Sequence, residues 1–157
     1  MPWLERTELL IGSENVEILQ NANVLVVGVG GVGAYAAEMI ARAGVGKMTL
    51  ADADIVSESN INRQLIALHS TVGREKCAVL AERLRDINPA LELTCVPRFI
   101  DESSVDSLLD SAEFDYAVDA IDTLSPKIAL IKGTLDRGIP LVSSMGSGGK
   151  MDPASLE

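Results

Sequence analysis

Residues 24–43 read VLVVGVGGVGAYAAEMIARA. The β-branched run that ends at Val27 predicts a short strand, and the residues from Ala34 to Ala43 predict a helix that stops at Gly44. The loop between them fits the G-x-G-x-x-G pattern, in which glycine allows a tight turn and lets a phosphate approach backbone N–H groups. Its glycines are Gly28, Gly30, Gly31 and Gly33. The stretch therefore predicts a nucleotide site, with a tight turn that binds nothing as the alternative.

The rest of the chain continues this alternation of strands and helices. Cys77, Leu80, Leu84 and Ile87 recur every three or four residues and mark the buried face of a helix. We expect strands at 48–52, 91–95, 116–121 and 140–142, and helices at 73–87 and from an N-cap at Ser125, with Pro126 at the first helical position, to Gly138. This order predicts one α/β domain with a doubly wound, Rossmann-like, mostly parallel sheet and helices on both faces. Ligands are expected at the carboxyl ends of its strands.

Composition restricts the class of protein. Of 157 residues 47% are hydrophobic but only 3% aromatic, a balance typical of helices packed on a parallel sheet. The net charge of -10 argues against a general nucleic-acid or anionic-membrane surface. No apolar run approaches the roughly 20 residues that span a bilayer, and the amino terminus lacks a signal-peptide pattern, so we expect a cytoplasmic protein. We interpret Cys77 and Cys95 as core residues, and the single histidine, His69, as structural.

Two carboxylates follow the second predicted strand. Asp52 lies 19 positions after Gly33, at a strand end, where an acidic side chain can accept hydrogen bonds from ribose hydroxyls. Asp54 is either a second contact or an ordinary loop carboxylate. Up to this point a nicotinamide-dependent oxidoreductase and an ATP-using enzyme explain the sequence equally well.

Two basic residues favour ATP. Arg63 lies among the amides of the stretch that contains Asn60, and Lys76 opens the next helix. An arginine and a lysine near strand ends can hold a triphosphate and neutralise the charge that develops when pyrophosphate leaves. The alternatives are a solvated or ion-paired arginine and an exposed helical lysine. A nicotinamide enzyme would leave both residues unexplained.

The order and spacing of these motifs resemble the adenylation domain of the ubiquitin-activating-like superfamily. The matching segments are residues 28–33, 41–46, 52–54, 60–64, 73–76 and 87–89. Two further segments, 119–127 and 143–153, are more similar to one branch, the tRNA threonylcarbamoyladenosine dehydratases, which cyclise a modified adenosine in tRNA. The resemblance extends from about Arg6 onward. It implies that residues 1–157 are an ATP-binding adenylation domain and the N-terminal part of a longer enzyme.

The resemblance also implies residue roles. The nucleotide loop would contain Gly28, Gly30, Gly31 and Gly33, and Gly30 and Gly31 would approach the phosphates. The ribose would be held by Asp52, with Asp54 beside it. The phosphates would be held by Asn60, Arg63 and Lys76. Asp122 would bind the magnesium that bridges the triphosphate, unless it caps the following helix. Arg6 looks like the arginine that reaches the ATP of a neighbouring subunit. The family further implies a homodimer, tRNA and a cysteine desulfurase system as partners, and a monovalent cation.

The expected reaction is the ATP-dependent adenylation of a carboxylate, the threonyl carboxylate of tRNA threonylcarbamoyladenosine. Cyclisation with net loss of water would follow. Within the superfamily, the alternative substrate is the C-terminal glycine of a ubiquitin-like sulfur carrier. A nicotinamide-dependent oxidoreductase and a non-catalytic nucleotide-binding module are alternatives from other classes. Since the family continues well beyond residue 157, this chain alone could be inactive.

Overall fold

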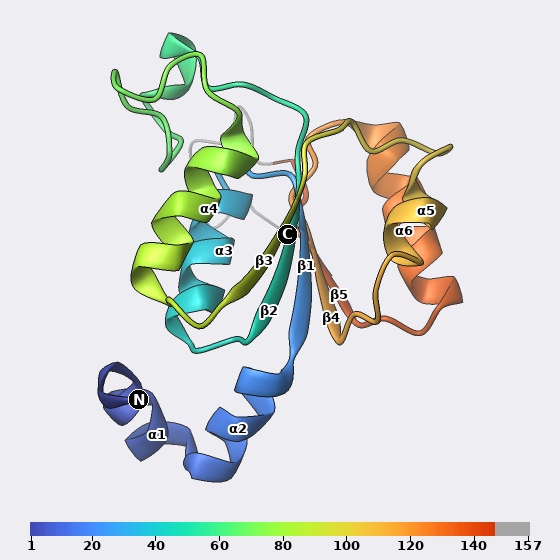
Figure 1. Cartoon of the computed structure of the whole chain (residues 1–157). Coiled ribbons are helices and arrows are strands. Elements are labelled where there is room, and N and C mark those ends of the chain that lie inside the picture. The colour runs from blue at the N-terminus through green and yellow to red at the C-terminus, as the bar shows by residue number, and fades with distance from the viewer. Residues whose placement is uncertain (147–157) are drawn as a thin grey trace.

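The computed structural model describes residues 1–146, and the sheet within them has five parallel strands (Figure 1). The strands are β1 (Asn23–Val27), β2 (Lys47–Ala51), β3 (Glu92–Val96), β4 (Tyr116–Asp119) and β5 (Leu141–Ser143). They are ordered β3-β2-β1-β4-β5, and each neighbouring pair is parallel. The chain moves outward from β1 in one direction and then in the other, which places a topological switch point between β1 and β4. The predicted doubly wound, Rossmann-like sheet is confirmed.

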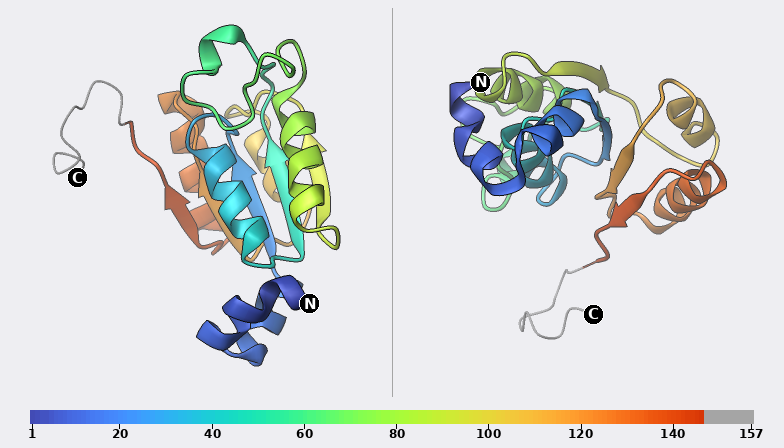
Figure 2. Two further views of the ribbon diagram at one scale, coloured as in Figure 1. Left: turned by 90° about the vertical axis from the view of Figure 1, so that its left-hand side faces the viewer. Right: turned by 90° about the horizontal axis from the view of Figure 1, so that it is seen from below.

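Helices cover both faces of this sheet. The helices α3 (Gly33–Arg42) and α4 (Lys76–Ile87) lie on one face, and α5 (Val105–Leu109) and α6 (Leu124–Asp136) lie on the other (Figure 1). The connection between β2 and α4 includes the short 3-10 helix η2 (Glu58–Asn60) and rises beyond the carboxyl ends of the strands (Figure 2). None of the helices in residues 1–146 is long and apolar enough to cross a membrane.

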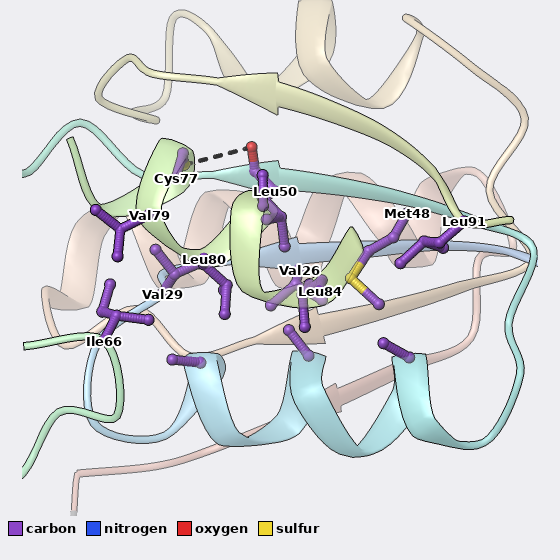
Figure 3. Packing of buried hydrophobic residues seen from close by; sticks show 14 of the residues in the cluster. Val26, Val29, Met48, Leu50, Ile66, Cys77, Val79, Leu80, Leu84 and Leu91 are labelled. Atoms are coloured by element: carbon purple, nitrogen blue, oxygen red, sulfur yellow. Dashed lines mark hydrogen bonds between the residues drawn. The ribbon is translucent and has the colours of Figure 1, made fainter. Parts of the chain in front are cut away.

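The larger core lies between the sheet and the pair α3 and α4. Leu80 and Leu84 of α4 have no exposed surface and pack with side chains such as Val26 and Leu50 of the central strands (Figure 3). The Cys77 thiol lies 3.6 Å from the carbonyl oxygen of Leu50 in the same layer. Burial raises the pKa of this thiol to about 12. The predicted buried face of α4 and the interpretation of Cys77 as a core residue are therefore confirmed.

A smaller core fills the opposite face, under α5 and α6. Leu25 and Val27 of β1 point into it, whereas Val24 and Val26 belong to the larger core. Since successive side chains of a strand point to opposite faces, a strand with helices on both sides needs apolar residues at every position. This requirement explains the uninterrupted run from Val24 to Val27.

Two helices that the sequence pattern did not predict precede the sheet. The helices α1 (Glu5–Ile11) and α2 (Ser13–Asn21) follow the short 3-10 helix η1 (Pro2–Leu4) and lie beyond the amino ends of the strands (Figures 1 and 2). The N–H of Gly46 donates to the carbonyl of Leu19 at 3.1 Å, and Leu4 is buried. Leu9 and Leu10 of α1, in contrast, are 73% and 84% exposed, and α1 has no buried residue.

Two predicted helix starts can be compared with the structure. The helix expected within residues 73–87 begins at Lys76, the residue expected to open it, and not at Gly73, because Gly73 has a φ of +84° and its N–H donates to the carbonyl of Val56 in a turn. Ser125 is not the N-cap of α6, which follows Thr123; the Ser125 hydroxyl donates instead to the Glu102 carboxylate.

The later strands also differ in detail. Strand β4 ends at Asp119 rather than at residue 121, and Tyr116 at its start is 42% exposed. The last strand begins one residue later than predicted. The glycine-rich segment that resembled the dehydratase branch lies mostly outside the described residues, from Ser147 onward.

Candidate active site

A cavity of about 620 Å³ opens at the carboxyl edge of the sheet, and every strand contributes to it through the loop that follows. Parallel strands bring the ends of their loops to one edge, so residues far apart in the sequence meet there. The predicted site residues that line this cavity are Gly28, Gly30, Gly31, Asp52, Asp54, Asn60, Arg63, Lys76 and Asp122.

Two of the loop glycines are needed by the protein itself. Gly28 has a φ of +87°, and a Cβ there would lie 2.6 Å from the carbonyl oxygen of Ala120. A Cβ on Gly33, which begins α3 and is not among the lining residues, would overlap the carbonyl oxygen of Gly28. Without side chains at Gly28 and Gly33, the loop can lie close to the end of β4 and α3 can pack directly against the end of β1. A side chain at either position would push these elements apart.

The other two glycines have no such constraint. A Cβ on Gly30 would find its nearest neighbour 3.6 Å away, in the Gln64 side chain, and one on Gly31 would find Arg63 at 3.8 Å. Neither residue has a positive φ. Because the fold would tolerate alanine at both positions and both line the cavity, the missing side chains leave room that a ligand can use.

Asp52 ties the glycine loop to the loop after β2. Its Oδ2 accepts a hydrogen bond from the N–H of Val29 at 2.7 Å, and its Oδ1 accepts one from the N–H of Asp54 at 2.8 Å. Each carboxylate oxygen can accept a further hydrogen bond. The side chain is therefore fixed in position and still able to accept hydrogen bonds from a ribose.

The lysine at the start of α4 is buried, unlike the exposed helical residue that was its alternative interpretation. Its side chain is 6% exposed, and Nζ donates to Oδ2 of Asp54 at 2.7 Å. Asp54 is 70% exposed, so the aspartate can move away while the lysine remains at the cavity wall. A buried ammonium group with one exposed anionic partner is suited to bind an incoming phosphate.

Asn60 and Arg63 come from the turn that starts at η2. Asn60 is buried, and its Oδ1 accepts a hydrogen bond from the N–H of Ser57 at 3.1 Å, so part of its role is to hold the turn. Arg63 is exposed, and one guanidinium nitrogen donates to the Ser59 carbonyl and the Asn62 side chain, both at 2.9 Å. Its other nitrogens are not used by these contacts and can bind an anion bidentately.

Asp122 lies in the loop after β4 and is exposed at the cavity wall. Its Oδ1 accepts a hydrogen bond from the Thr123 hydroxyl at 3.3 Å. Within residues 1–146 no three His, Cys, Asp or Glu side chains cluster as a metal-ligand set. One carboxylate fits Mg²⁺, which is usually bound by one or two carboxylates together with substrate phosphates and water.

Arg6 lies away from this cavity. It is exposed on α1, beyond the opposite ends of the strands, and is not among the lining residues (Figure 1). Within this chain, therefore, the fold does not bring Arg6 to the other predicted site residues. Its expected contact with the site of a neighbouring subunit stays a prediction.

A buried ion pair beside the cavity was missed as a functional feature. Asp119 at the end of β4 has no exposed surface, and its Oδ2 accepts a hydrogen bond from Lys127 Nζ at 2.6 Å. The same ammonium group donates to the carbonyl of Ser144 at 2.9 Å, and Asp119 Oδ1 accepts from the N–H of Ile121. The pair thus positions the loops after β4 and β5. The available signal in the sequence was a charged residue, Asp119, inside the strand predicted at 116–121.

A doubly wound parallel sheet with a glycine loop next to its switch point defines the class of Rossmann-like α/β domains. Within that class, the chain belongs to the ThiF family, whose sequence profile matches residues 4–154.

The chain is similar to two bacterial proteins named tRNA threonylcarbamoyladenosine dehydratase. It is 47% identical to the one from Bacillus subtilis over 152 residues, which cover 97% of this chain and 59% of that protein. It is 42% identical to the Escherichia coli protein over 158 residues, which cover 99% of this chain and 59% of that protein. The molybdopterin-synthase adenylyltransferase of Escherichia coli is 38% identical over 127 residues, 81% of this chain and 50% of that protein.

Solved structures give the same relation. The crystal structure of the Escherichia coli tRNA N6-threonylcarbamoyladenosine dehydratase in complex with ATP matches 98% of this chain and 63% of that chain, with a TM-score of 0.93 and 42% identity. The chain therefore spans about three fifths of the length of these relatives.

Proposed function

We propose that this chain is the nucleotide-binding part of an enzyme that uses ATP to adenylate a carboxylate. The observation that carries the proposal is the cavity itself, where two open glycines, Gly30 and Gly31, lie with the cations Arg63 and Lys76. A similar protein of known structure was solved with ATP bound, which supports ATP as the nucleotide. The proposed substrate is the threonyl carboxylate of threonylcarbamoyladenosine in tRNA, because relatives at 42% and 47% identity bear that dehydratase name.

In the proposed reaction, a carboxylate oxygen attacks the α-phosphorus of ATP, a P–O bond forms, and the bond to pyrophosphate breaks. Arg63 and Lys76 balance the negative charge that develops on the phosphates. No general base is needed, since a carboxylate is already ionised at neutral pH. A ureido nitrogen of the same nucleoside then attacks the activated carbonyl, loses its proton and displaces AMP. The ring closes, and the overall change in the nucleoside is the loss of one water.

Asp122 is the residue proposed to hold Mg²⁺ against the triphosphate. When bound there, the ion would supply positive charge to the phosphate oxygens. Asp52 would hold the ribose through lone pairs that its contacts with Val29 and Asp54 leave free. Arg6, the homodimer, the monovalent cation, the cysteine desulfurase partner and a cytoplasmic location remain predictions from the family resemblance.

The second candidate is adenylation of a sulfur carrier's C-terminal glycine, favoured by the 38% identity to a molybdopterin-synthase adenylyltransferase. Both candidates use the same ATP chemistry and differ in the carboxylate. A nicotinamide-dependent oxidoreductase does not account for the buried Lys76 or for Arg63 at the cavity, and a non-catalytic module would bind ATP without turnover.

The deciding experiment is ATP–pyrophosphate exchange with Mg²⁺, measured with tRNA that carries threonylcarbamoyladenosine, with unmodified tRNA, and with a sulfur-carrier protein. It should include both this chain and a longer one with the region present in the relatives. Exchange that depends on modified tRNA supports the dehydratase, and exchange only with the carrier supports the second candidate. Arg63→Ala should abolish most of the exchange, whereas Arg85→Ala, an exposed arginine on α4, should not. Nicotinamide binding without ATP binding would refute both.

A further inference from the structure

The ion pair of Lys127 and Asp119 is buried more deeply than a structural contact requires. The Lys127 side chain is 7% exposed, and the Asp119 side chain has no exposed surface. Removing two charges from water is unfavourable by about as much as their attraction stabilises them, so a well-packed apolar pair would hold the fold equally well. The groups that the pair binds must therefore explain its presence.

The hydrogen bonds of the pair all go to the ends of β4 and β5. Besides Asp119, Lys127 Nζ donates to the carbonyl of Ser144 at 2.9 Å and to the hydroxyl of Ser143 at 3.4 Å. The Asp119 carboxylate accepts hydrogen bonds from the Ser143 hydroxyl and from the N–H of Ile121. The N–H of Ser144 donates to the backbone carbonyl of Asp119 at 2.8 Å. The first peptide group of the loop after β5 is thus held from both sides.

This loop depends on such side-chain contacts. Strand β5 has only three residues, and within residues 1–146 it pairs with β4 alone. A short edge strand makes few ladder hydrogen bonds, so they determine weakly where the chain leaves the sheet. The loop then lines the cavity with Ser144, Met145 and Gly146, whereas Lys127 does not line it. Lys127 therefore sets the position of a cavity wall without reaching the cavity.

The order of the strands indicates what this wall would contact. Asp52, Arg63 and Lys76 all follow β2, on one side of β1, and the loops after β4 and β5 lie on the other side. In a displacement at phosphorus, the attacking and leaving oxygens lie roughly in line. Since Arg63 and Lys76 would hold the departing pyrophosphate, the attacking carboxylate would approach from the side of β4 and β5.

We propose that Lys127 is a positioning residue for the carboxylate substrate, because it holds the loop after β5 as the wall that orients this carboxylate. The inference rests on the proposed adenylation and adds the part of the cavity that serves the second substrate. Lys127 acts through the Ser144 carbonyl and touches neither substrate. A misplacement of about 1 Å, even from a change far from the reacting atoms, lowers a rate by about a hundredfold.

The test uses the double variant Asp119→Asn with Lys127→Met, which removes both charges and leaves no unpaired buried carboxylate. Asparagine keeps an oxygen for the N–H of Ile121, whereas methionine donates nothing to Ser144. Deuterium exchange of the Ser144 N–H should become about ten- to a hundredfold faster, as expected when a hydrogen bond to a charged group is lost. Exchange of the Gly28 N–H, which donates to the Ala51 carbonyl, should not change.

Kinetics then separate positioning from stability. ATP affinity of the folded double variant, measured by calorimetry with Mg²⁺, should stay within about twofold of wild type, because distant sites act independently. In the longer chain, ATP–pyrophosphate exchange should fall by about ten- to a hundredfold, with a raised KM for the carboxylate substrate and an unchanged KM for ATP. A residue that only stabilises the fold would change neither KM.

Two single variants complete the comparison. Ser143→Ala removes the hydroxyl that lies between the two charges and keeps the pair itself. It should raise the KM for the carboxylate substrate in the same direction by a smaller factor. Lys132→Met, at an exposed lysine of the same helix, is the matched control and should change no measurement.

The outcomes separate this inference from the proposed function. If wild type shows exchange and the double variant keeps the same KM for the carboxylate substrate, the inference is wrong and the proposed function stands. Equal losses of ATP affinity and exchange in the double variant would also overturn it, because the whole site would then be disturbed. Unchanged deuterium exchange at Ser144 would do the same. If the wild-type longer chain shows no exchange with any of the carboxylates, the proposed function fails, and the role of Lys127 fails with it.

Discussion

Lys76 and Asp54 form an ion pair of unequal burial: Nζ lies 2.7 Å from Oδ2, with the lysine side chain 6% and the aspartate 70% exposed. A pair of this kind binds a phosphate by exchanging one anion for another. Lys76→Met should leave Asp54 solvated and place an apolar side chain in the buried position. The free energy of unfolding should therefore change by less than about 1 kcal/mol. ATP affinity should fall at least about tenfold, as expected for a lost charged contact. Calorimetry on the folded variant measures both, and unchanged affinity would exclude Lys76 from phosphate binding.

The glycine loop allows a matched comparison of a structural and a ligand-binding position. Gly28→Ala should destabilise the fold by more than about 2 kcal/mol, because it combines a positive φ with a contact of 2.6 Å to the Ala120 carbonyl. Gly30→Ala should fold normally and bind ATP more weakly, because its methyl group enters only the cavity. Urea unfolding and ATP titration of both variants measure the difference. Normal ATP binding by Gly30→Ala would show that phosphate does not approach there.

Lys127 should be important for stability. Removing it leaves Asp119, which has no exposed surface, without its cation, and such a loss costs about 3–5 kcal/mol. Lys127→Met should therefore lower the free energy of unfolding by that amount, and adding Asp119→Asn should restore part of it. Lys132→Met, an exposed lysine on the same helix, is the control and should have almost no effect. If Lys127→Met, the double variant with Asp119→Asn and Lys132→Met all have the same free energy of unfolding in urea, the buried pair does not contribute to stability.

The charge network of Glu38 predicts a pH dependence. Hydrogen bonding from Arg83, with a smaller part from Arg42, holds the pKa of this nearly buried carboxyl below its usual range. Because the pKa of Glu38 is lower in the folded protein than in the unfolded chain, its ionised carboxylate stabilises the fold. This stabilisation is complete at pH values above the unfolded-chain pKa of about 4.3, and it is lost as the pH falls through the folded-state pKa. Glu38→Gln should cost about 1–2 kcal/mol at pH 7, and the difference should shrink below about pH 4. Glu82→Gln, in an exposed pair with Arg74, should show a smaller effect at every pH.

Burial should make Cys77 unreactive in the native protein. Its thiol pKa is raised to about 12, chiefly by loss of contact with water, so almost no thiolate exists at pH 8. Iodoacetamide should leave Cys77 unmodified in the folded chain and modify it in guanidinium, as peptide mass spectrometry would show. Rapid native modification would mean that α4 opens from the sheet.

The sequence by itself determined the order of the elements and most of the cavity. The glycine spacing, the apolar run of β1 and the buried face of α4 reflect local backbone sterics and periodicity. They can therefore be predicted from the sequence without knowledge of tertiary contacts. The exclusion of residues 73–75 from α4 depends on a tertiary contact, because the N–H of Gly73 donates to the carbonyl of Val56, 17 positions earlier in the sequence. The helices α1 and α2 were not predicted: α1 has no buried residue, and the carboxyl end of α2 is held by hydrogen bonds from the N–H groups of Gly46 and Lys47.

Only the tertiary structure decided which side chains have partners. It showed that Lys76 is buried against Asp54, that Lys127 neutralises Asp119, and that the enclosed Oε1 of Gln64 accepts no hydrogen bond within residues 1–146. It also separated the glycines that the fold requires, Gly28 and Gly33, from those that leave room for a ligand. The physical reason is that burial and hydrogen bonding depend on what surrounds a residue in three dimensions. A one-dimensional pattern records the type of residue and its spacing, but not what lies beside it.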